Sequence, residues 1–189
     1  MVWILVAILA IALVVAGVLL MRQRQSQQLQ EGFGPEYERT VQDRGDRREA
    51  EAELRERRDR RDQLEIRELE PAARDRYAER WQAAQRQFVD EPAPAVGEAD
   101  SLVTEVMRER GYPVEGDFEQ RAADVSVDHP QVVEHYRAAH AISVRTTDGD
   151  TGTEDLRQAM VHFRALFEEL LGPDADRADA APRSETSRR

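Results

Sequence analysis

The stretch TEDLRQAMVHFRALFEELL, residues 153–171, decides the fold class. Its apolar residues recur every three or four positions, which places them along one face of an α-helix. Thr153 is suited to cap the N-terminus of this helix, and Gly172-Pro173 ends it. This is the strongest amphipathic pattern in the chain, and its apolar face consists of Leu156, Ala159, Met160, Phe163, Leu166, Phe167 and Leu170.

Three further helices are predicted before this stretch. The first begins at Pro71 and ends at the proline-containing break of residues 91–94, and the second ends before Gly111 and Pro113. A shorter turn is expected at residues 118–123. The third helix follows Asp128-His129-Pro130 and runs to about Val144, before a loop at residues 146–152. No stretch alternates like a strand, so we predict an all-α fold, with residues 65–172 forming a bundle of four or five helices.

The first 22 residues predict a transmembrane anchor. Residues 2–21 contain no charged side chain, and twenty residues at about 1.5 Å each would span the roughly 30 Å hydrocarbon core. Trp3 stands where an interfacial aromatic residue would lie. The alternative is a cleaved signal peptide, but the chain has no positively charged start and the apolar run is longer than a signal peptide needs.

Arginines next to the apolar run predict the orientation of the anchor. Arg22, Arg24 and Arg39 follow the run, and no charged side chain precedes it. Because positive charge close to a membrane span favours the cytoplasmic side, we expect the rest of the chain to face the cytoplasm of a bacterial cell. The alternative is a body that lies outside the membrane or is secreted.

Two charged or polar segments are expected between the anchor and the bundle. Residues 23–34 are rich in glutamine and predict a flexible linker. Residues 35–64 alternate acids and arginines at i,i+4 spacing and predict a charged helical stalk, either a solvated spacer or a weak coiled coil. Residues 173–189 are small, charged and proline-containing, which predicts a disordered tail.

Composition excludes several classes of function. The chain has 27 basic and 38 acidic residues, a net charge of −11, and every basic residue is an arginine. An acidic body repels nucleic-acid phosphates, so we expect no nucleic-acid partner. The chain has no cysteine, which excludes disulfides, thiolate nucleophiles and cysteine-ligated zinc.

Histidines are the obvious candidates for chemistry, but their spacing does not form a site. Glu134-His135 is followed by His140 at i+5, whereas a zinc-binding helix needs histidines at i and i+4. His140 shares the apolar face of its helix, which favours a buried histidine with its hydrogen bonds made. We find no glycine-rich phosphate loop and no nucleophile elbow, and therefore predict no catalytic, cofactor or metal site.

Five residues look more specific than packing requires: Tyr112, Arg121, Asp128, His129 and His135. An exposed tyrosine in Arg110-Gly111-Tyr112-Pro113-Val114 would be a good contact residue for a partner. The alternative is a helix stop in which Tyr112 folds back onto Met107. For Arg121, Asp128 and His129, the alternative is a connection between helices held by salt bridges.

The chain resembles a group of bacterial proteins common in high-GC Gram-positive bacteria. The resemblance covers residues 33–171 and is carried by the motifs FGPEY (33–37), RGYPV (110–114), FEQRAAD (118–124) and DHP (128–130). It implies an N-terminal membrane segment and a helical body. It brings no known activity, cofactor or catalytic residue.

These observations lead to two hypotheses. The first is a non-enzymatic protein tethered to the lipid bilayer, whose body binds a protein partner that the sequence does not identify. The second is a ligand-binding or hydrolytic domain that uses histidines near residues 111–140. A metal bound to the purified chain would favour the second hypothesis.

Overall fold

The structure, a computed structural model, describes residues 2–147 and 151–172, with the backbone alone for residues 2–12, 14, 18 and 147. In these residues it contains helices and no strand, which confirms the predicted all-α class. The helices are α1 (Val2–Phe33), α2 (Pro35–Arg44), α3 (Arg47–Asp62), α4 (Pro71–Gln87), α5 (Pro92–Arg110), α6 (Phe118–Asp128), α7 (Val133–Thr147) and α8 (Thr153–Leu171).

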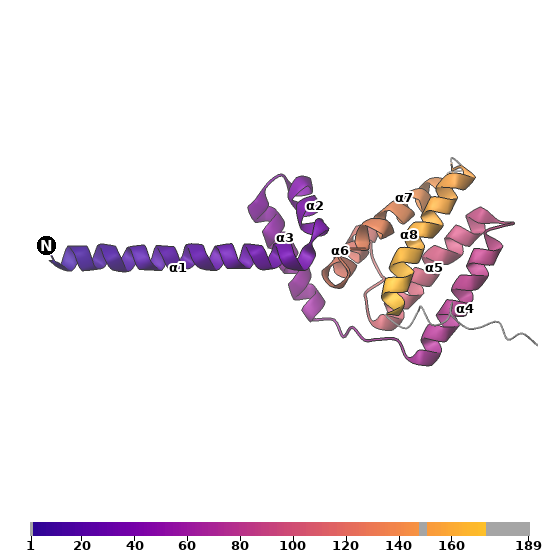
Figure 1. Cartoon of the computed structure of the whole chain (residues 1–189), viewed down its shortest axis with the longest axis horizontal. Helices are drawn as coiled ribbons and strands as arrows, with labels where there is room; N and C mark the ends of the chain where they lie inside the picture. The colour runs from indigo at the N-terminus through magenta and orange to yellow at the C-terminus, as the bar shows by residue number, and fades with distance from the viewer. Residues whose placement is uncertain (1, 148–150, 173–189) are drawn as a thin grey trace, which may run out of the picture.

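Helix α1 projects away from the other helices as one long rod (Figure 1). Within the described part of the chain, no helix has a stretch that is both long enough and apolar enough to cross a bilayer. The side chains of Trp3 and of most other residues of the predicted anchor are not described, so the anchor stays a prediction. Arg22 and Arg24 are exposed on α1.

The expectation of a flexible linker at residues 23–34 is wrong, because α1 continues unbroken to Phe33. Ser26, Leu29 and Phe33 lie three or four residues apart on α1 and are buried against the next two helices. This packing stabilises a segment whose polar composition alone does not predict a helix.

Residues 35–64 are largely helical, as expected for the charged stalk, but they do not form one solvated helix. Helices α2 and α3 fold back on each other at Gly45, which adopts a left-handed φ of 69°, and Asp46 caps α3 by accepting hydrogen bonds from two backbone N–H groups. Together with the end of α1 they form a unit that we call the tether hairpin, residues 26–62. Its small apolar core consists of Leu29, Phe33, Tyr37 and Leu54.

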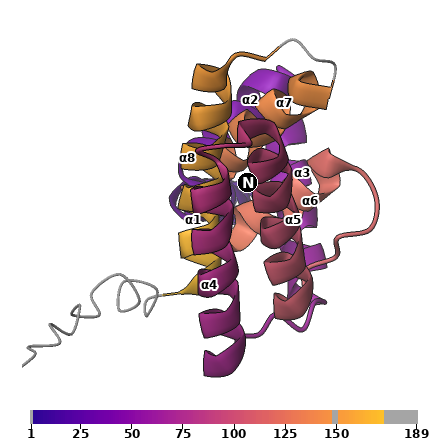
Figure 2. The same cartoon turned by 90° about the vertical axis from the view of Figure 1, so that its right-hand side faces the viewer.

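Helices α4 to α8 form the predicted bundle, which we call the helical body, residues 71–172. Helix α8 packs against both α5 and α7, and α4 packs against α5 (Figure 2). The predicted apolar face of α8 is buried, and its Phe167 ring stacks on Trp81 of α4 with the ring centroids 4.6 Å apart. The predicted turn at residues 118–123 is longer than expected and is the helix α6.

Residues 63–70 join the tether hairpin to the helical body without forming a helix. Within this connection, the backbone N–H of Arg67 donates a hydrogen bond to the carbonyl of Arg110, 2.8 Å away. The predicted loop at 146–152 falls partly on residues outside the described ranges, and the predicted disordered tail at 173–189 falls wholly outside them.

Candidate functional site

Two of the candidate interaction residues bind each other. Tyr112 is buried, and its hydroxyl donates a hydrogen bond of 2.6 Å to Asp128 at the end of α6. Arg61 of α3 donates through Nε to both oxygens of the same carboxylate, at 2.7 and 2.8 Å. Burial, and then the bond to Asp128, raise the pKa of the Tyr112 phenol. Tyr112 is therefore part of a hydrogen-bonded group inside the molecule, which we call the internal tie. The expectation of an exposed tyrosine that contacts a partner is wrong.

His129 belongs to a neighbouring group of polar contacts that connects α5 and α8. Its Nδ1 lies 3.0 Å from Glu169, and its Nε2 lies 3.3 Å from the Arg110 guanidinium, which also donates to the carbonyl of Leu170. The ring is almost completely buried. Contacts between helices therefore account for Asp128 and His129.

Gly111 shows why the RGYPV motif needs its glycine. Its φ is 97°, in the left-handed region, and a Cβ added there would lie 2.5 Å from the carbonyl oxygen of Glu65. The end of α5 can therefore approach the connection at residues 63–70 only if residue 111 has no side chain.

His135 and Arg121 lie in two other places. His135 meets His162 of α8 with the two Nδ1 atoms 2.9 Å apart and the ring centroids 5.1 Å apart, an almost direct approach that fits one N–H donating to the other ring. Arg121 donates to the carbonyls of Val114 and Gly116, both at 3.3 Å. Across the described residues, no three histidine, aspartate or glutamate side chains gather as ligands for a metal ion.

His140 was expected to be buried with its hydrogen bonds made. It is half-buried, and its ring stacks on Phe118 with the centroids 3.7 Å apart. Its Nδ1 is buried and has no hydrogen-bond partner among the described residues, so the second half of the expectation is wrong. Burial lowers the pKa of the ring, which favours the neutral imidazole.

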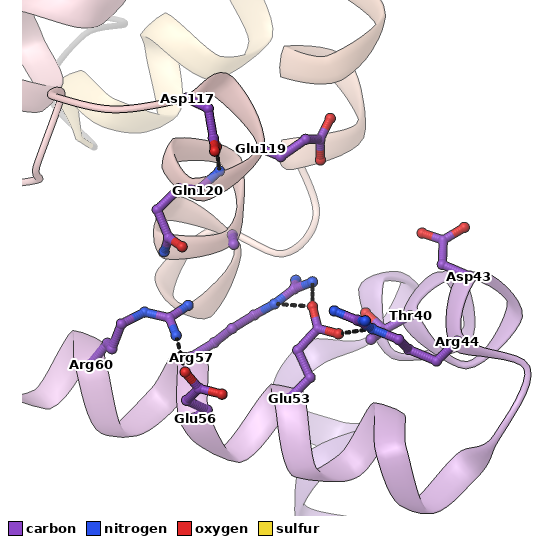
Figure 3. Close-up of a pocket in the computed structure, with 11 residues that line it drawn as sticks. Thr40, Asp43, Arg44, Glu53, Glu56, Arg57, Arg60, Asp117, Glu119 and Gln120 are labelled. Carbon is purple, nitrogen blue, oxygen red and sulfur yellow. Dashed lines mark hydrogen bonds and ion pairs between the residues drawn. The ribbon is translucent and has the colours of Figure 1, made fainter.

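A charged groove lies where the tether hairpin faces α6 (Figure 3). Its volume is about 480 Å³. Residues of α2 and α3 line one side, and the start of α6 lines the other. The lining residues are Thr40, Asp43, Arg44, Glu53, Glu56, Arg57, Arg60, Asp117, Glu119, Gln120 and Ala123.

The arginines of this groove are already bound to acids of the same chain. Arg44 and Arg57 both bind Glu53, and Arg60 binds Glu56 at 3.0 Å. The side chains of Glu56 and Glu119, in contrast, are 72% and 70% exposed on opposite sides of the groove. Five acids and three arginines line the groove, which leaves an excess of negative charge.

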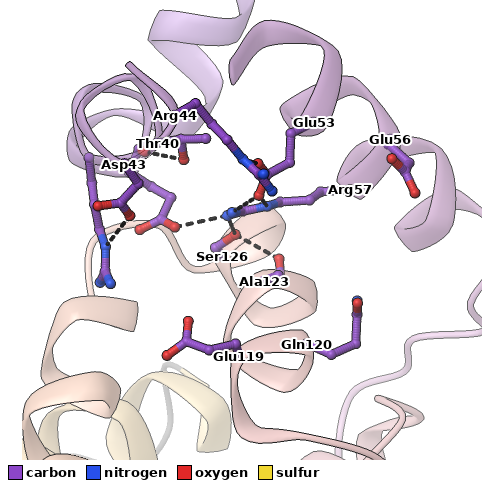
Figure 4. A network of polar contacts seen from close by, with 12 residues as sticks. Thr40, Asp43, Arg44, Glu53, Glu56, Arg57, Glu119, Gln120, Ala123 and Ser126 are labelled. Carbon is purple, nitrogen blue, oxygen red and sulfur yellow. Dashed lines mark hydrogen bonds and ion pairs between the residues drawn. The ribbon is translucent and has the colours of Figure 1, made fainter. Parts of the chain in front are cut away.

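A buried ion cluster lies beside the groove, and Figure 4 shows one of its members, Arg57, next to Ser126. Glu36 of α2 is 1% exposed and accepts hydrogen bonds from Arg57 of α3 at 2.9 Å and from Arg137 of α7 at 2.7 and 2.8 Å. Arg57 also reaches Ser126 of α6, which donates to the carbonyl of Ala123. Three helices, α2, α3 and α7, therefore meet at one carboxylate, and Arg57 links α6 to this cluster through Ser126.

Sequence reasoning missed both the groove and the ion cluster. Both Glu36 and Arg57 fall in residues 35–64, where the sequence predicts a charged stalk whose arginines pair with acids at i,i+4 spacing. The pair of Arg57 with Glu53 exists, but Arg57 is also buried against Glu36. A signal was present in FGPEY, because Glu36 stands beside two residues, Phe33 and Tyr37, that are apolar enough to be buried.

The chain matches no known family model, no curated protein and no solved structure. The resemblance based on the FGPEY, RGYPV and DHP motifs therefore stays a prediction. What the structure adds is a physical role for several residues of these motifs, which lie at contacts between helices.

Proposed function

We propose that this protein is a membrane-tethered, non-enzymatic interaction module, and that the charged groove is the surface that binds its protein partner. The groove itself is the observation that supports this proposal most directly. It has room for side chains of a partner, and it presents exposed carboxylates from two elements, α3 and α6. Charged groups at a binding surface contribute more to the specificity and the rate of association than to the affinity.

The tether is the second part of the proposal. Residues 2–21 carry no charge and continue directly into the helix that enters the tether hairpin. Arg22, Arg24 and Arg39 favour a body on the cytoplasmic face of a bacterial membrane. Alkaline extraction of membranes should leave the full chain in the pellet and release a chain that begins at Gln23. Protease digestion of the body in intact cells would contradict the cytoplasmic placement.

A photo-crosslinking amino acid tests the groove as a binding surface. Placed at Glu56 or Glu119 in the full chain, in the cells that produce it, the crosslinker should capture the same partner from both sides of the groove. Val89 is the matched control, because it is 82% exposed at the end of α4 and lies outside the groove. Equal capture at Val89, or different proteins captured at Glu56 and Glu119, would contradict the proposal.

The hydrolytic alternative gains no support from the positions of its histidines. His129, His135 and His140 take part in three separate contacts, with Glu169, His162 and Phe118 respectively. A shared reaction would require these groups around one substrate atom.

A further inference from the structure

The tether hairpin and the helical body have separate hydrophobic cores. The hairpin core is built from residues of α1, α2 and α3, and the body core from residues of α4 to α8 and the segments that join them. Val127 of α6 packs against the hairpin core from the body. Because each unit buries its own apolar side chains, each one has its own source of stability.

The contacts across the junction between these units are mainly polar. Arg39 of α2 binds Glu134 of α7 at 2.8 Å, and Arg60 of α3 lies 3.5 Å from Asp124 of α6. Further polar contacts across the junction are the bonds of Glu36 to Arg137, of Arg57 to Ser126 and of Arg61 to Asp128. An arginine guanidinium takes part in every one of these contacts.

We infer that the junction is a polar latch, and that the tether hairpin and the helical body separate and re-dock as two rigid units around the connection at residues 63–70. The two bonds of Glu36 to Arg137 hold the latch closed, and the bond of Arg57 to Glu36 inside the hairpin holds the carboxylate in place. Opening changes the width of the groove, because α2 and α3 line one side of it and α6 the other. A ligand that binds one state more tightly shifts this equilibrium.

Glu36 is central to the latch because it is the anion shared by two nearly buried arginines. The side chains of Arg57 and Arg137 are each 9% exposed, and both bind the same carboxylate. Without the charge of Glu36, the two guanidiniums would repel each other across the junction. Arg57 would keep its bond to Glu53 inside the hairpin, so separation of the units would relieve the repulsion without unfolding α3.

The test is a distance measurement between the two units in the full chain. The chain contains no cysteine, so Gln42→Cys on α2 and Val89→Cys at the end of α4 can carry two spin labels at unique positions. Pulsed electron paramagnetic resonance in lipid nanodiscs then gives the distance distribution. We expect one narrow population in the parent chain. In the Glu36→Gln variant, the ratio of the open to the closed population should rise on the order of a hundredfold.

Two variants make the result specific. Arg39→Gln removes a more exposed pair at the same junction and should raise the open-to-closed ratio roughly twofold to fivefold. Glu98→Gln weakens an ion pair with Arg80 inside the body and should leave the distance distribution unchanged. This control matches Glu36→Gln in chemistry but not in position.

Hydrogen exchange separates opening from unfolding. In Glu36→Gln the backbone amides around Leu54, in the middle of α3, should remain protected if the hairpin moves as a unit. An unchanged distance distribution in Glu36→Gln would overturn the inference. Loss of protection around Leu54 together with the distance change would also overturn it, because the junction would then belong to a single folding unit.

Discussion

Tyr112 and Asp128 lie sixteen residues apart and are joined by a hydrogen bond of 2.6 Å from a buried phenol to a carboxylate. The same carboxylate binds Arg61 of the tether hairpin. The tie therefore links the end of α5, the end of α6 and the end of α3. Residues that look like surface contacts in the sequence serve here to position helices.

Tyr112→Phe should destabilise the chain by about 1.5–3 kcal/mol, because a bond to a charged group is lost from a buried site. The measurement is the free energy of unfolding from urea titration in detergent. Tyr136→Phe is the matched control, since the Tyr136 hydroxyl is buried and has no hydrogen-bond partner among the described residues. Tyr136→Phe should leave the free energy of unfolding almost unchanged or raise it. An equal decrease in both variants would contradict a stabilising hydrogen bond from Tyr112 to Asp128.

Gly111→Ala should be more destabilising than Gly116→Ala. Both glycines have a left-handed φ, of 97° and 100°, so both substitutions introduce backbone strain of about 1 kcal/mol. At Gly111 the new Cβ would also lie 2.5 Å from the Glu65 oxygen, whereas no described atom lies within 4 Å at Gly116. Differential scanning calorimetry should therefore show a clearly lower Tm for Gly111→Ala. Equal Tm values would mean that the 63–70 connection moves aside.

Leu54→Ala should destabilise the tether hairpin by about 2–5 kcal/mol, because it opens a cavity in a small core. Hydrogen exchange should show faster exchange of the amides of α2 and α3, while α8 stays protected. A solvated stalk would give a different result, since an exposed leucine can be replaced at almost no cost. Unchanged exchange in Leu54→Ala would therefore support the stalk.

The contact of His135 with His162 should make the chain less stable as the pH falls. Burial lowers the pKa of His162 below its usual value of 6.5, and a charge on His135 lowers it further. The unfolded chain therefore takes up the proton first, and the contribution of this ring to stability is lost as the pH falls below about 6.5. Unfolding free energies measured between pH 7.5 and 5 should fall less steeply in His162→Gln. An identical slope in both proteins would contradict this.

All helices of the body except α6 could be predicted, because each of them carries its own evidence in the sequence. The apolar face of α8 is complete within one stretch of sequence. The predicted threonine cap is wrong, because Thr153 is the first residue of α8 and Gly152 occupies the N-cap position without a side-chain bond. Pro71 likewise marks the start of α4. The predicted break at residues 91–94 is shorter than expected, because α5 already begins at Pro92. Periodicity within one segment was sufficient for all of these.

The tether hairpin could not be predicted in this way, because its core is assembled from several segments. Leu29 and Phe33 come from α1, Tyr37 from α2 and Leu54 from α3, so no single segment carries an apolar face. The burial of Arg57 and Arg137 depends on Glu36, which is distant in sequence from both. From a sequence of alternating acids and arginines alone, one cannot predict which of these side chains become buried.

The unbroken course of α1 gives the molecule a fixed rotational phase. An α-helix turns about 100° and rises about 1.5 Å for each residue, so the number of residues before Phe33 sets the direction in which the hairpin and its groove face. One residue inserted after Arg24 would turn the whole body by more than a quarter of a circle. Length and orientation are therefore set by the same stretch of helix.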